Sequence, residues 1–328
     1  MMFKYIVKRL LYVVFVFFIV SIIMFGVYKM IPGDPARMML DSSISSVDPE
    51  RYEAMYQAAR ERLGLDKPLP IQYLSWITNM LRGNFGYSSQ YRVPVSQLIK
   101  EPMINTIKLN IVSLILVFAI TIPLGIATAV KKYSAFDNTV QVGTVVGYSL
   151  PSFVISLLMI FLFAVRLPIF PISGVNSPGF TGTGLERFLD TAYHMCLPVL
   201  VMTLSSLGGI TRYVRSAMID VLQMDYIRTA RAKGLPQKVV IYSHAFRNAL
   251  IPVVTILTSW FVGIFGGSVV IESIFQWNGM GKVMIDGLRQ LDFMVVLAMQ
   301  MFYVVITLIG NLIMDLGYSL VDPRVKLS

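Results

Sequence analysis

Few residues in this chain have the types and spacing that catalysis or metal binding requires. The two histidines, His194 and His244, are far apart, and Cys196 is the sole cysteine. The pair His194-x-Cys196 supplies two ligands at most, whereas a zinc site uses three or four. We therefore interpret it as a loop histidine beside a buried thiol, and we predict no metal site.

Nucleophile and phosphate-binding motifs are absent from the sequence as well. The Ser205-Ser206 pair and Ser216 have no histidine and aspartate arranged nearby to activate a hydroxyl. The segment Gly281-Lys282-Val283 lacks the Ser or Thr that follows the lysine of a phosphate-binding loop. We predict that the chain has no catalytic residue and no cofactor, and that it is not an enzyme.

The composition is that of a membrane protein. Of 328 residues, 55% are hydrophobic and only 14% are charged, against about 25% charged in ordinary soluble domains. A soluble fold cannot hide so much apolar surface behind its polar skin, and a disordered chain would be far more polar. The net charge of +10 would suggest nucleic-acid binding in a soluble protein, so its distribution along the chain matters.

Six apolar stretches have about the 20 residues that a helix needs to cross the hydrocarbon. They are Leu10–Ile31, Ile104–Val130, Thr139–Val165, Met195–Ile210, Ala249–Ile271 and Phe293–Leu316. Lys4, Lys8 and Arg9 precede the first stretch, as in a secretory signal, but the stretch is too long for one and no small-x-small site follows. We expect an uncleaved first span, and an all-α fold with six transmembrane helices.

The basic residues predict the orientation. With the N-terminus in the cytoplasm, the cytoplasmic segments are the N-terminal tail, Lys131–Asn138, Arg212–Asn248 and the tail from Gly317. These short segments hold 14 of the 28 Lys and Arg but are together only about half as long as the external segments. Their density of basic residues is therefore about twice as high, as expected for cytoplasmic loops. Both termini are therefore predicted to be cytoplasmic, in a multi-pass protein of the cell membrane. Because topology explains the positive charge, we predict no nucleic-acid partner.

Charged groups are scarce in the predicted spans. Lys29 and Glu272 lie near span ends, where we expect their charged ends to reach the interface. Asp315, near the end of the sixth span, is expected to pair with a loop arginine. A carrier driven by protons or sodium usually has acids near the midplane, so translocation powered from elsewhere is favoured. The glycines of Gly143–Gly147 suit close helix packing, with a moving gate as the alternative.

The chain is expected to have three parts: residues 1–31 with the first span, an external subdomain over 32–103, and a five-helix core over 104–328. Within the external part, Pro68–Tyr87 has helical apolar spacing. The apolar positions are Ile71, Leu74, Ile77 and Leu81. We expect this helix to pack on the spans.

The cytoplasmic segment Arg212–Asn248 carries the sharpest pattern. It predicts a short basic helix over Asp225–Lys233, with Gly234 as its stop and Pro236 preventing continuation. Small side chains on neighbouring turns would let another protein approach closely. An ordinary basic loop explains the Lys and Arg but not a well-delimited helix lying flat between two spans. We therefore interpret the helix as a docking element.

This loop resembles the cytoplasmic motif of the permease subunits of ATP-binding-cassette importers, specifically the dipeptide/oligopeptide permease B family. The family motif is Glu-Ala-Ala, three residues, Gly, nine residues, Ile-x-Leu-Pro. Ala230 and Gly234 match it, and Pro252 matches a further proline downstream. Arg228 replaces the Glu, Thr229 the first Ala, and Phe246-Arg247 the Leu-Pro. These departures resemble the peptide subfamily's Tyr-x-x-Thr-Ala-Arg-Ala-Lys-Gly.

The resemblance extends over nearly the whole chain. The similar segments are Ile31-Pro-Gly-Asp-Pro35, Leu63–Pro70, Gly83–Ser88, Pro151-Ser-Phe153 through Gly174, Glu272-Ser-Ile-Phe275, Gly279-Met-Gly281 and Asp322-Pro-Arg324.

The resemblance implies a transport subunit working in a larger assembly. A homologous second permease would complete the path, two ATPase subunits would dock on the cytoplasmic loops, and an extracytoplasmic binding protein would deliver substrate. The implied ATPase-coupling residues are Asp225, Tyr226, Thr229, Ala230, Arg231 and Gly234. Peptides are the implied cargo, with nickel or oligosaccharides as alternatives. A free-standing channel or secondary carrier is the alternative from another class.

Overall fold

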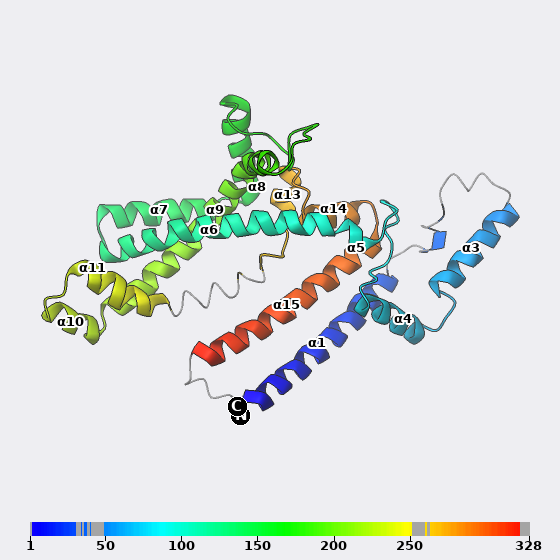
Figure 1. The fold of residues 1–328 in the computed structure, drawn as a ribbon, viewed down its shortest axis with the longest axis horizontal. Helices are drawn as coiled ribbons and strands as arrows, with labels where there is room; N and C mark the ends of the chain where they lie inside the picture. Colours follow the sequence, from blue (N-terminus) through cyan, green and yellow to red (C-terminus); the bar gives the residue numbers. More distant parts are fainter. Residues whose placement is uncertain are drawn as a thin grey trace. The chain divides into compact units, whose positions relative to one another are not determined.

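The computed structural model describes residues 2–30, 34, 36–37, 40, 49–250, 260 and 263–321. Over these residues the regular structure is helical (Figure 1). The chain forms two compact units, Met1–Glu101 with Val283–Ser328, and Pro102–Lys282. Four helices are long and apolar enough to cross a membrane, and a bent pair makes up to five candidates. The chain is therefore an all-α polytopic membrane protein.

Three predicted stretches coincide with long helices. They are α1 (Met2–Met30), α6 (Lys100–Val130) and α15 (Phe293–Val321). The fifth predicted stretch, Ala249–Ile271, falls largely on 251–259 and 261–262, which lie outside the described residues. The side chain of Asp315, expected to pair with an arginine, also lies outside them.

The third predicted stretch is broken rather than straight. It consists of α7 (Ala135–Ser149), then α8 (Ser152–Met159) continued by the π-helical η2 (Ile160–Arg166). The two parts are bent by 99°. The break falls at Leu150, whose ψ of 128° is extended, because a residue before proline avoids the helical region. Pro151 itself has no N–H to continue the ladder, so the predicted stretch consists of two helices rather than one.

The fourth predicted stretch was too short. It lies inside α9 (Leu185–Leu222), which has 38 residues and is therefore about 57 Å long at 1.5 Å per residue. Hydropathy drops near Asp190, Arg212 and Arg215, so the apolar window underestimates the helix. The cytoplasmic segment predicted to begin at Arg212 thus starts as a continuation of α9.

In the first unit, α1 and α15 lie side by side (Figure 1). The same unit contains the helices that follow α1, which are α3 (Pro49–Leu63), α4 (Leu69–Leu81) and α5 (Val95–Leu98). The helix predicted over Pro68–Tyr87 is thus confirmed, but not the face expected to pack. Ile77 and Met80 are buried, whereas Ile71, Leu74 and Leu81 are exposed.

The carboxylate of Asp34 anchors α3 in this unit. It accepts hydrogen bonds from the Ala36 N–H, at 2.9 Å, and from the Tyr56 hydroxyl, and Arg60 Nη1 lies 3.4 Å away. Burial alone would raise the pKa of Asp34, but the hydrogen bonds and the positive charges outweigh it and hold the pKa below its usual value. Asp34 is thus ionised at neutral pH.

The second unit is built around α9. Helix α7 packs along it, α8 crosses it, and α13 (Val269–Ile274) contacts both α8 and α9. A Cβ on Gly208 would lie 2.5 Å from the Thr144 carbonyl oxygen and 3.0 Å from Tyr148 Cβ. Because apolar side chains gain nothing by leaving lipid for each other, close backbone approach of this kind is what holds membrane helices together.

The contact at Gly208 makes a matched pair of variants informative. We expect Gly208→Ala to lower the thermal stability of the purified protein in detergent, since overpacking costs about 1–3 kcal/mol. Gly209→Ala is the control, because a Cβ there meets no atom within 4 Å and alanine favours a helix. The measurement is the aggregation midpoint. Equal midpoints for the two variants would refute the close approach.

Candidate functional site

The loop helix α10 (Asp225–Ala232) begins and ends close to the predicted residues. Met224 is its N-cap and makes no side-chain cap, so Asp225 is the first helical residue. Its carboxylate there favourably opposes the positive end of the helix dipole. At the other end, Gly234 has φ of +72° and donates its N–H to the Arg231 carbonyl at 2.9 Å. Glycine adopts this left-handed conformation without strain, which ends the helix.

One face of α10 is part of the protein core. Ile227 is completely buried and Ala230 is 5% exposed. They belong to one apolar cluster with residues of α6, α9 and the segment that follows α10. Its other buried members are Val117, Ile126, Ala129, Ile210, Val214, Met218, Val240, Ala245 and Ala249. The loop helix is therefore packed firmly against the helices that precede and follow it.

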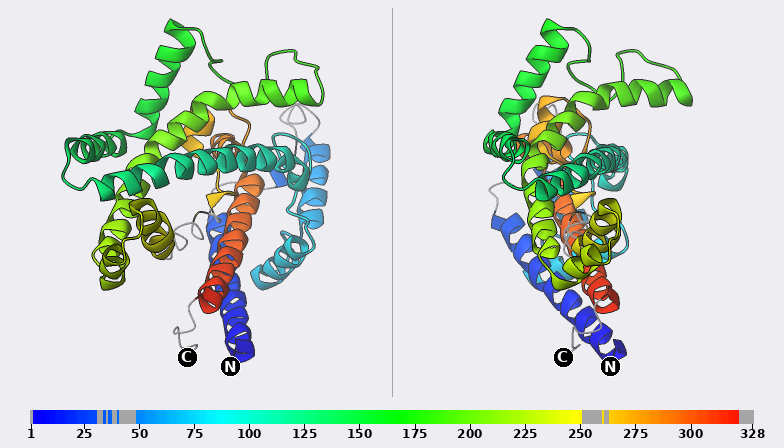
Figure 2. Two further views of the ribbon diagram at one scale, coloured as in Figure 1. Left: turned by 60° about the vertical axis from the view of Figure 1, so that its left-hand side comes forward. Right: turned by 90° about the vertical axis from the view of Figure 1, so that its left-hand side faces the viewer.

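The segment after α10 completes this base. It contains α11 (Gln237–Val239) and a π-helical turn, η3 (Val240–Phe246). Both α9 and α10 contact η3. In both views of Figure 2, α10 lies at the C-terminal end of α9. Inserted residues in a helix are frequent at functional sites, and here the wide turn places Val240 and Ala245 in the core cluster.

The predicted site residues divide between two faces. Asp225, Tyr226, Thr229 and Arg231 are exposed, and we call these residues, which surround α10 outside its buried side of Ile227 and Ala230, the outer face of α10. Ala230 is buried and points into the core, so it cannot be the small residue that lets a partner approach. A Cβ on Gly234 would meet nothing within 4 Å.

Arg228 adds a group that the predicted set omitted. Its Nη1 lies 3.5 Å from Asp225 Oδ1 on the outer face, and both side chains are largely exposed. Exposed pairs of this kind contribute little to stability. Asp225 and Arg228 are three residues apart in a predicted helix, and this spacing alone could have predicted the pair.

A buried ion pair stabilises the region behind the loop. Arg215 Nε and Nη2 donate to Asp137 Oδ1 and Oδ2 at 2.7 and 2.6 Å, joining α9 to the start of α7. Asp137 is 1% exposed and also accepts from the Tyr133 N–H at 2.9 Å. Ser134 caps α7 by accepting from the Asp137 N–H. Sequence reasoning missed this pair. The Ser-x-x-Asp capping pattern was visible, but its partner is 78 residues away.

Glu272 forms a second buried centre. It was expected to reach an interface, yet it is 1% exposed. It accepts from the Thr106 hydroxyl at 2.9 Å and from the Lys282 N–H at 3.0 Å. The hydroxyl oxygen of Thr106 in turn accepts from the Met280 N–H. A buried carboxylate needs such partners, and the Thr106 side chain and the backbone after α13 provide them. The prediction that the charged end of Glu272 reaches the membrane interface was therefore wrong.

Two glycines make this centre possible. A Cβ on Gly279 would lie 2.6 Å from Glu272 Oε2, and one on Gly281 would lie 2.6 Å from the Val269 N–H nitrogen. The neighbouring Trp277 is fully buried and donates to the Asn105 carbonyl oxygen at 3.2 Å. The segments Glu272-Ser-Ile-Phe275 and Gly279-Met-Gly281 therefore form one packed structure with the start of α6.

A serine, a histidine and an aspartate do meet elsewhere, but not as a catalytic triad. Ser177 Oγ donates to Asp190 Oδ1 at 2.6 Å and lies 3.3 Å from His194 Nε2. Asp190 approaches the same Nε2, at 3.9 Å, while His194 Nδ1 has no partner among the described residues. A triad needs serine and aspartate on opposite ring nitrogens. The hydroxyl proton is directed at the carboxylate, so this cluster fastens the loop before α9.

Apolar helices with few charged residues define the class of protein, which is a multi-pass membrane protein. The family follows from sequence comparison. Residues 121–327 match the family model described as binding-protein-dependent transport system inner membrane component. Residues 2–110 match the model of the corresponding N-terminal region. The chain belongs to this family of transport-system permease components and is a multi-pass protein of the plasma membrane.

Individual relatives match over their full lengths. The chain is 40% identical to the oligopeptide transport system permease protein AppB of Bacillus subtilis (strain 168), over 98% of this chain and 99% of that protein. It is 35% identical to the dipeptide transport system permease protein DppB of Escherichia coli (strain K12), over 99% of each. It is also 35% identical to the di/tripeptide permease protein DppB of Pseudomonas aeruginosa (strain UCBPP-PA14), over 99% of each.

The Asp137–Arg215 pair is open to direct test. Arg215→Gln leaves a buried carboxylate without its charge partner, and breaking a buried pair costs about 3–5 kcal/mol. We expect the lower end, because Arg215 is still 19% exposed. Arg212→Gln is the matched control, since Arg212 is exposed on the same helix. Thermal aggregation midpoints of the purified proteins compare them. An unchanged midpoint for Arg215→Gln would contradict a stabilising role.

Proposed function

We propose that this chain is one of two permease subunits of an ATP-binding-cassette importer that moves di- and oligopeptides into the cell. The observation that carries the proposal is the full-length identity with relatives named as oligopeptide, dipeptide and di/tripeptide permease proteins. Nickel and oligosaccharides are the alternative cargoes for the same assembly. A homologous permease completes the path, and an extracytoplasmic binding protein supplies the peptide.

Two separate ATPase subunits supply the free energy for transport. The chain itself has no phosphate-binding loop, and the Ser177 cluster has the wrong geometry for nucleophilic catalysis. ATP hydrolysis is therefore assigned to partner chains. ATP binding favours one arrangement of those subunits, and a docked permease follows because the two arrangements have different affinities for it.

The outer face of α10 is the proposed docking surface for an ATPase. Asp225, Tyr226, Thr229 and Arg231 supply exposed polar, charged and aromatic groups on about two helical turns. Ala230 and Gly234 contribute indirectly: Ala230 lets α10 lie close to the core, and Gly234 ends the helix. Because Ile227 and Ala230 share the core cluster with α6 and α9, a displacement of α10 moves those helices with it.

Six spans with both termini in the cytoplasm are the proposed topology. The fifth span would come from 249–271, and α7 with α8 and η2 would make the bent third one. In this arrangement the basic loop 212–248 and α10 lie on the side of the ATPases, as the proposed mechanism requires. The distribution of Lys and Arg supports it.

Transport by a reconstituted assembly tests function and docking together. We expect vesicles with both permeases, the ATPases and the binding protein to accumulate a labelled dipeptide only with internal ATP. Thr229→Trp should strongly reduce this uptake by obstructing the outer face, since disrupting a central interface position costs about 2 kcal/mol, roughly 30-fold in affinity. Thermal stability of the Thr229→Trp permease should be unchanged.

Two controls distinguish docking from folding. Gln237→Trp places the same side chain on exposed α11 and should leave uptake intact. Ala230→Trp should reduce thermal stability, because Ala230 lies in the core cluster. Full uptake by Thr229→Trp would refute the docking surface. ATP-independent uptake by the chain alone would instead identify a secondary carrier or channel.

Reporter fusions test the topology. A phosphatase or fluorescent reporter fused after Asn138 should report a cytoplasmic position, because Lys131 and Lys132 hold that loop inside. A fusion after Thr181 should report the external side. Expression of each fusion is confirmed by immunoblot. The reverse pair of signals would overturn the orientation and place α10 outside, away from any ATPase.

A further inference from the structure

Helix α4 contains no Asp, Glu, Lys, Arg or His, although it belongs to a segment predicted to be external. The neighbouring charges are Asp66 and Lys67 before it and Arg82 after it. Surface helices exposed to water on one side normally carry charged residues there. The absence of charge along all of α4 therefore needs a physical explanation.

One side of α4 is fixed against α1. The rings of Tyr73 and Trp76 each lie with centroids 5.6 Å from that of Phe25. The Tyr73 hydroxyl is 2.7 Å from Ser21 Oγ, and at the next level of α1 the Lys29 ammonium donates to Gln72 Oε1 at 2.5 Å. This side determines the height of α4 along α1.

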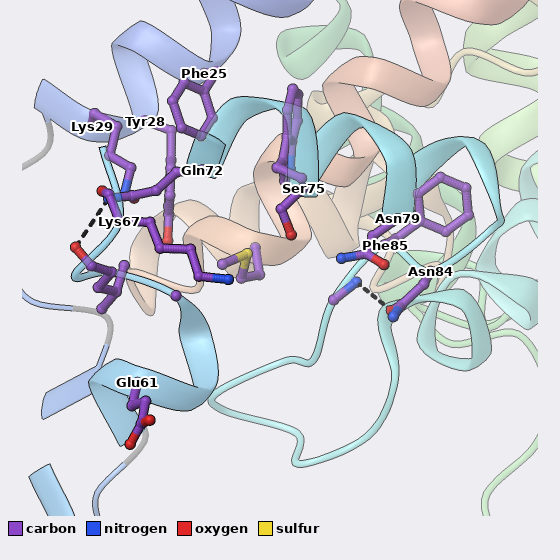
Figure 3. Close-up of a pocket in the computed structure, with 15 residues that line it drawn as sticks. Phe25, Tyr28, Lys29, Glu61, Lys67, Gln72, Ser75, Asn79, Asn84 and Phe85 are labelled. Carbon is purple, nitrogen blue, oxygen red and sulfur yellow. Dashed lines mark hydrogen bonds between the residues drawn. The ribbon is translucent and has the colours of Figure 1, made fainter. Parts of the chain in front are cut away.

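A second side of α4 is polar and lines a pocket. Gln72, Ser75 and Asn79 recur at helical spacing and face a cavity of about 240 Å³ (Figure 3). Lys29 and Lys67 also line it. Polar groups without full charges can meet water along this side, while the long lysine side chains reach past it.

The remaining side is apolar and exposed. Ile71 is 48% exposed, Leu74 60% and Leu81 66%. Spacings of three and seven residues place them on one stripe, turned away from the rings that contact α1. On α1, Ile22 and Ile23 are also more than half exposed. In a membrane-spanning helix such a surface faces lipid.

The level of the contact on α1 matches the edge of the bilayer. The candidate span Tyr5–Met30 has 26 residues, about 39 Å of helix at 1.5 Å per residue. About 30 Å of it, or roughly 20 residues, can lie in hydrocarbon, and with Lys8 and Arg9 at the interface these are Leu10–Lys29. Phe25 is four residues before Lys29, which puts the rings of Tyr73 and Trp76 about 6 Å inside the hydrocarbon boundary.

We infer that α4 is an interfacial helix, which lies in the headgroup boundary on the side where α1 ends, with Ile71, Leu74 and Leu81 among lipid acyl chains. Tyr and Trp are enriched at this depth, and interfacial helices bury their apolar face about 5–10 Å. The height of α4 on α1, at the edge of the hydrocarbon, favours lipid over a protein partner. The segment is thus anchored to the membrane between α1 and α6.

Site-specific quenching in phospholipid vesicles tests this assignment. The full chain carries Cys196→Ser, which removes the sole native cysteine, and one new cysteine labelled with an environment-sensitive fluorophore. With Leu74→Cys, we expect quenching by lipids carrying a nitroxide near the headgroup end of the acyl chain, and loss of quenching by aqueous iodide. With Asn79→Cys, on the polar side of the same helix, iodide should quench and the lipid quencher should have the smaller effect.

Leu81→Cys and Ser75→Cys are a second matched pair, should either label at 74 or 79 disturb folding. Equal iodide quenching at positions 74 and 79 would overturn the inference. So would iodide quenching at 74 that is suppressed only by adding a binding protein, since this would identify a protein docking face. Protection of position 74 from both quenchers would also overturn it, because a polypeptide would then cover the stripe.

Discussion

Lipid offers the peptide backbone no hydrogen-bonding partner, and most of this structure follows from that constraint. Each segment that enters the membrane must satisfy its backbone internally, so the described apolar segments are helices. Apolar side chains gain little from contact with each other there, so association depends on close packing and a few buried polar contacts. Gly208 against Thr144 illustrates the first, and Asp137 with Arg215 the second.

The same constraint explains where irregular backbone is tolerated. The turn after α13 lies beside two side chains that accept hydrogen bonds from its backbone. Glu272 and Thr106 accept backbone N–H groups of Lys282 and Met280. A carboxylate inside the protein is costly, and here it is stabilised by the Lys282 N–H, which lies in the first turn of α14 (Met280–Arg289), where backbone N–H groups have no helical carbonyl as partner.

Much of the architecture could be predicted from the sequence because membrane insertion leaves a strong one-dimensional signal. Hydropathy located α1, α6 and α15, and the Gly234–Pro236 pattern gave the end of α10. What it could not give were contacts between distant residues. Arg215 was read only as loop charge because its partner Asp137 is remote in sequence, and Glu272 was read as a span-end charge for the same reason. The face of α4 that packs was misassigned because apolar periodicity does not distinguish lipid from protein.

The loop helix shows a related limit. Its small residues predicted a close approach, and a close approach exists, but Ala230 makes it with the chain's own core rather than with another subunit. Small residues in the sequence indicate that a helix packs closely against something. Only the three-dimensional structure identifies the residues against which it packs. For α10, the proposal that its outer face binds a partner subunit depends on the family match and the relatives.

The two-sided character of α10 has a consequence for how this segment tolerates genetic variation. Inward positions such as Ile227 are governed by the volume available in the core, so tolerated replacements there are small and apolar whatever else the cell expresses. Outward positions such as Tyr226 are exposed on this chain, so folding alone places little restriction on them. In the proposed assembly, replacements there would be limited by the partner's surface, so the eight residues of α10 would be under two separate constraints.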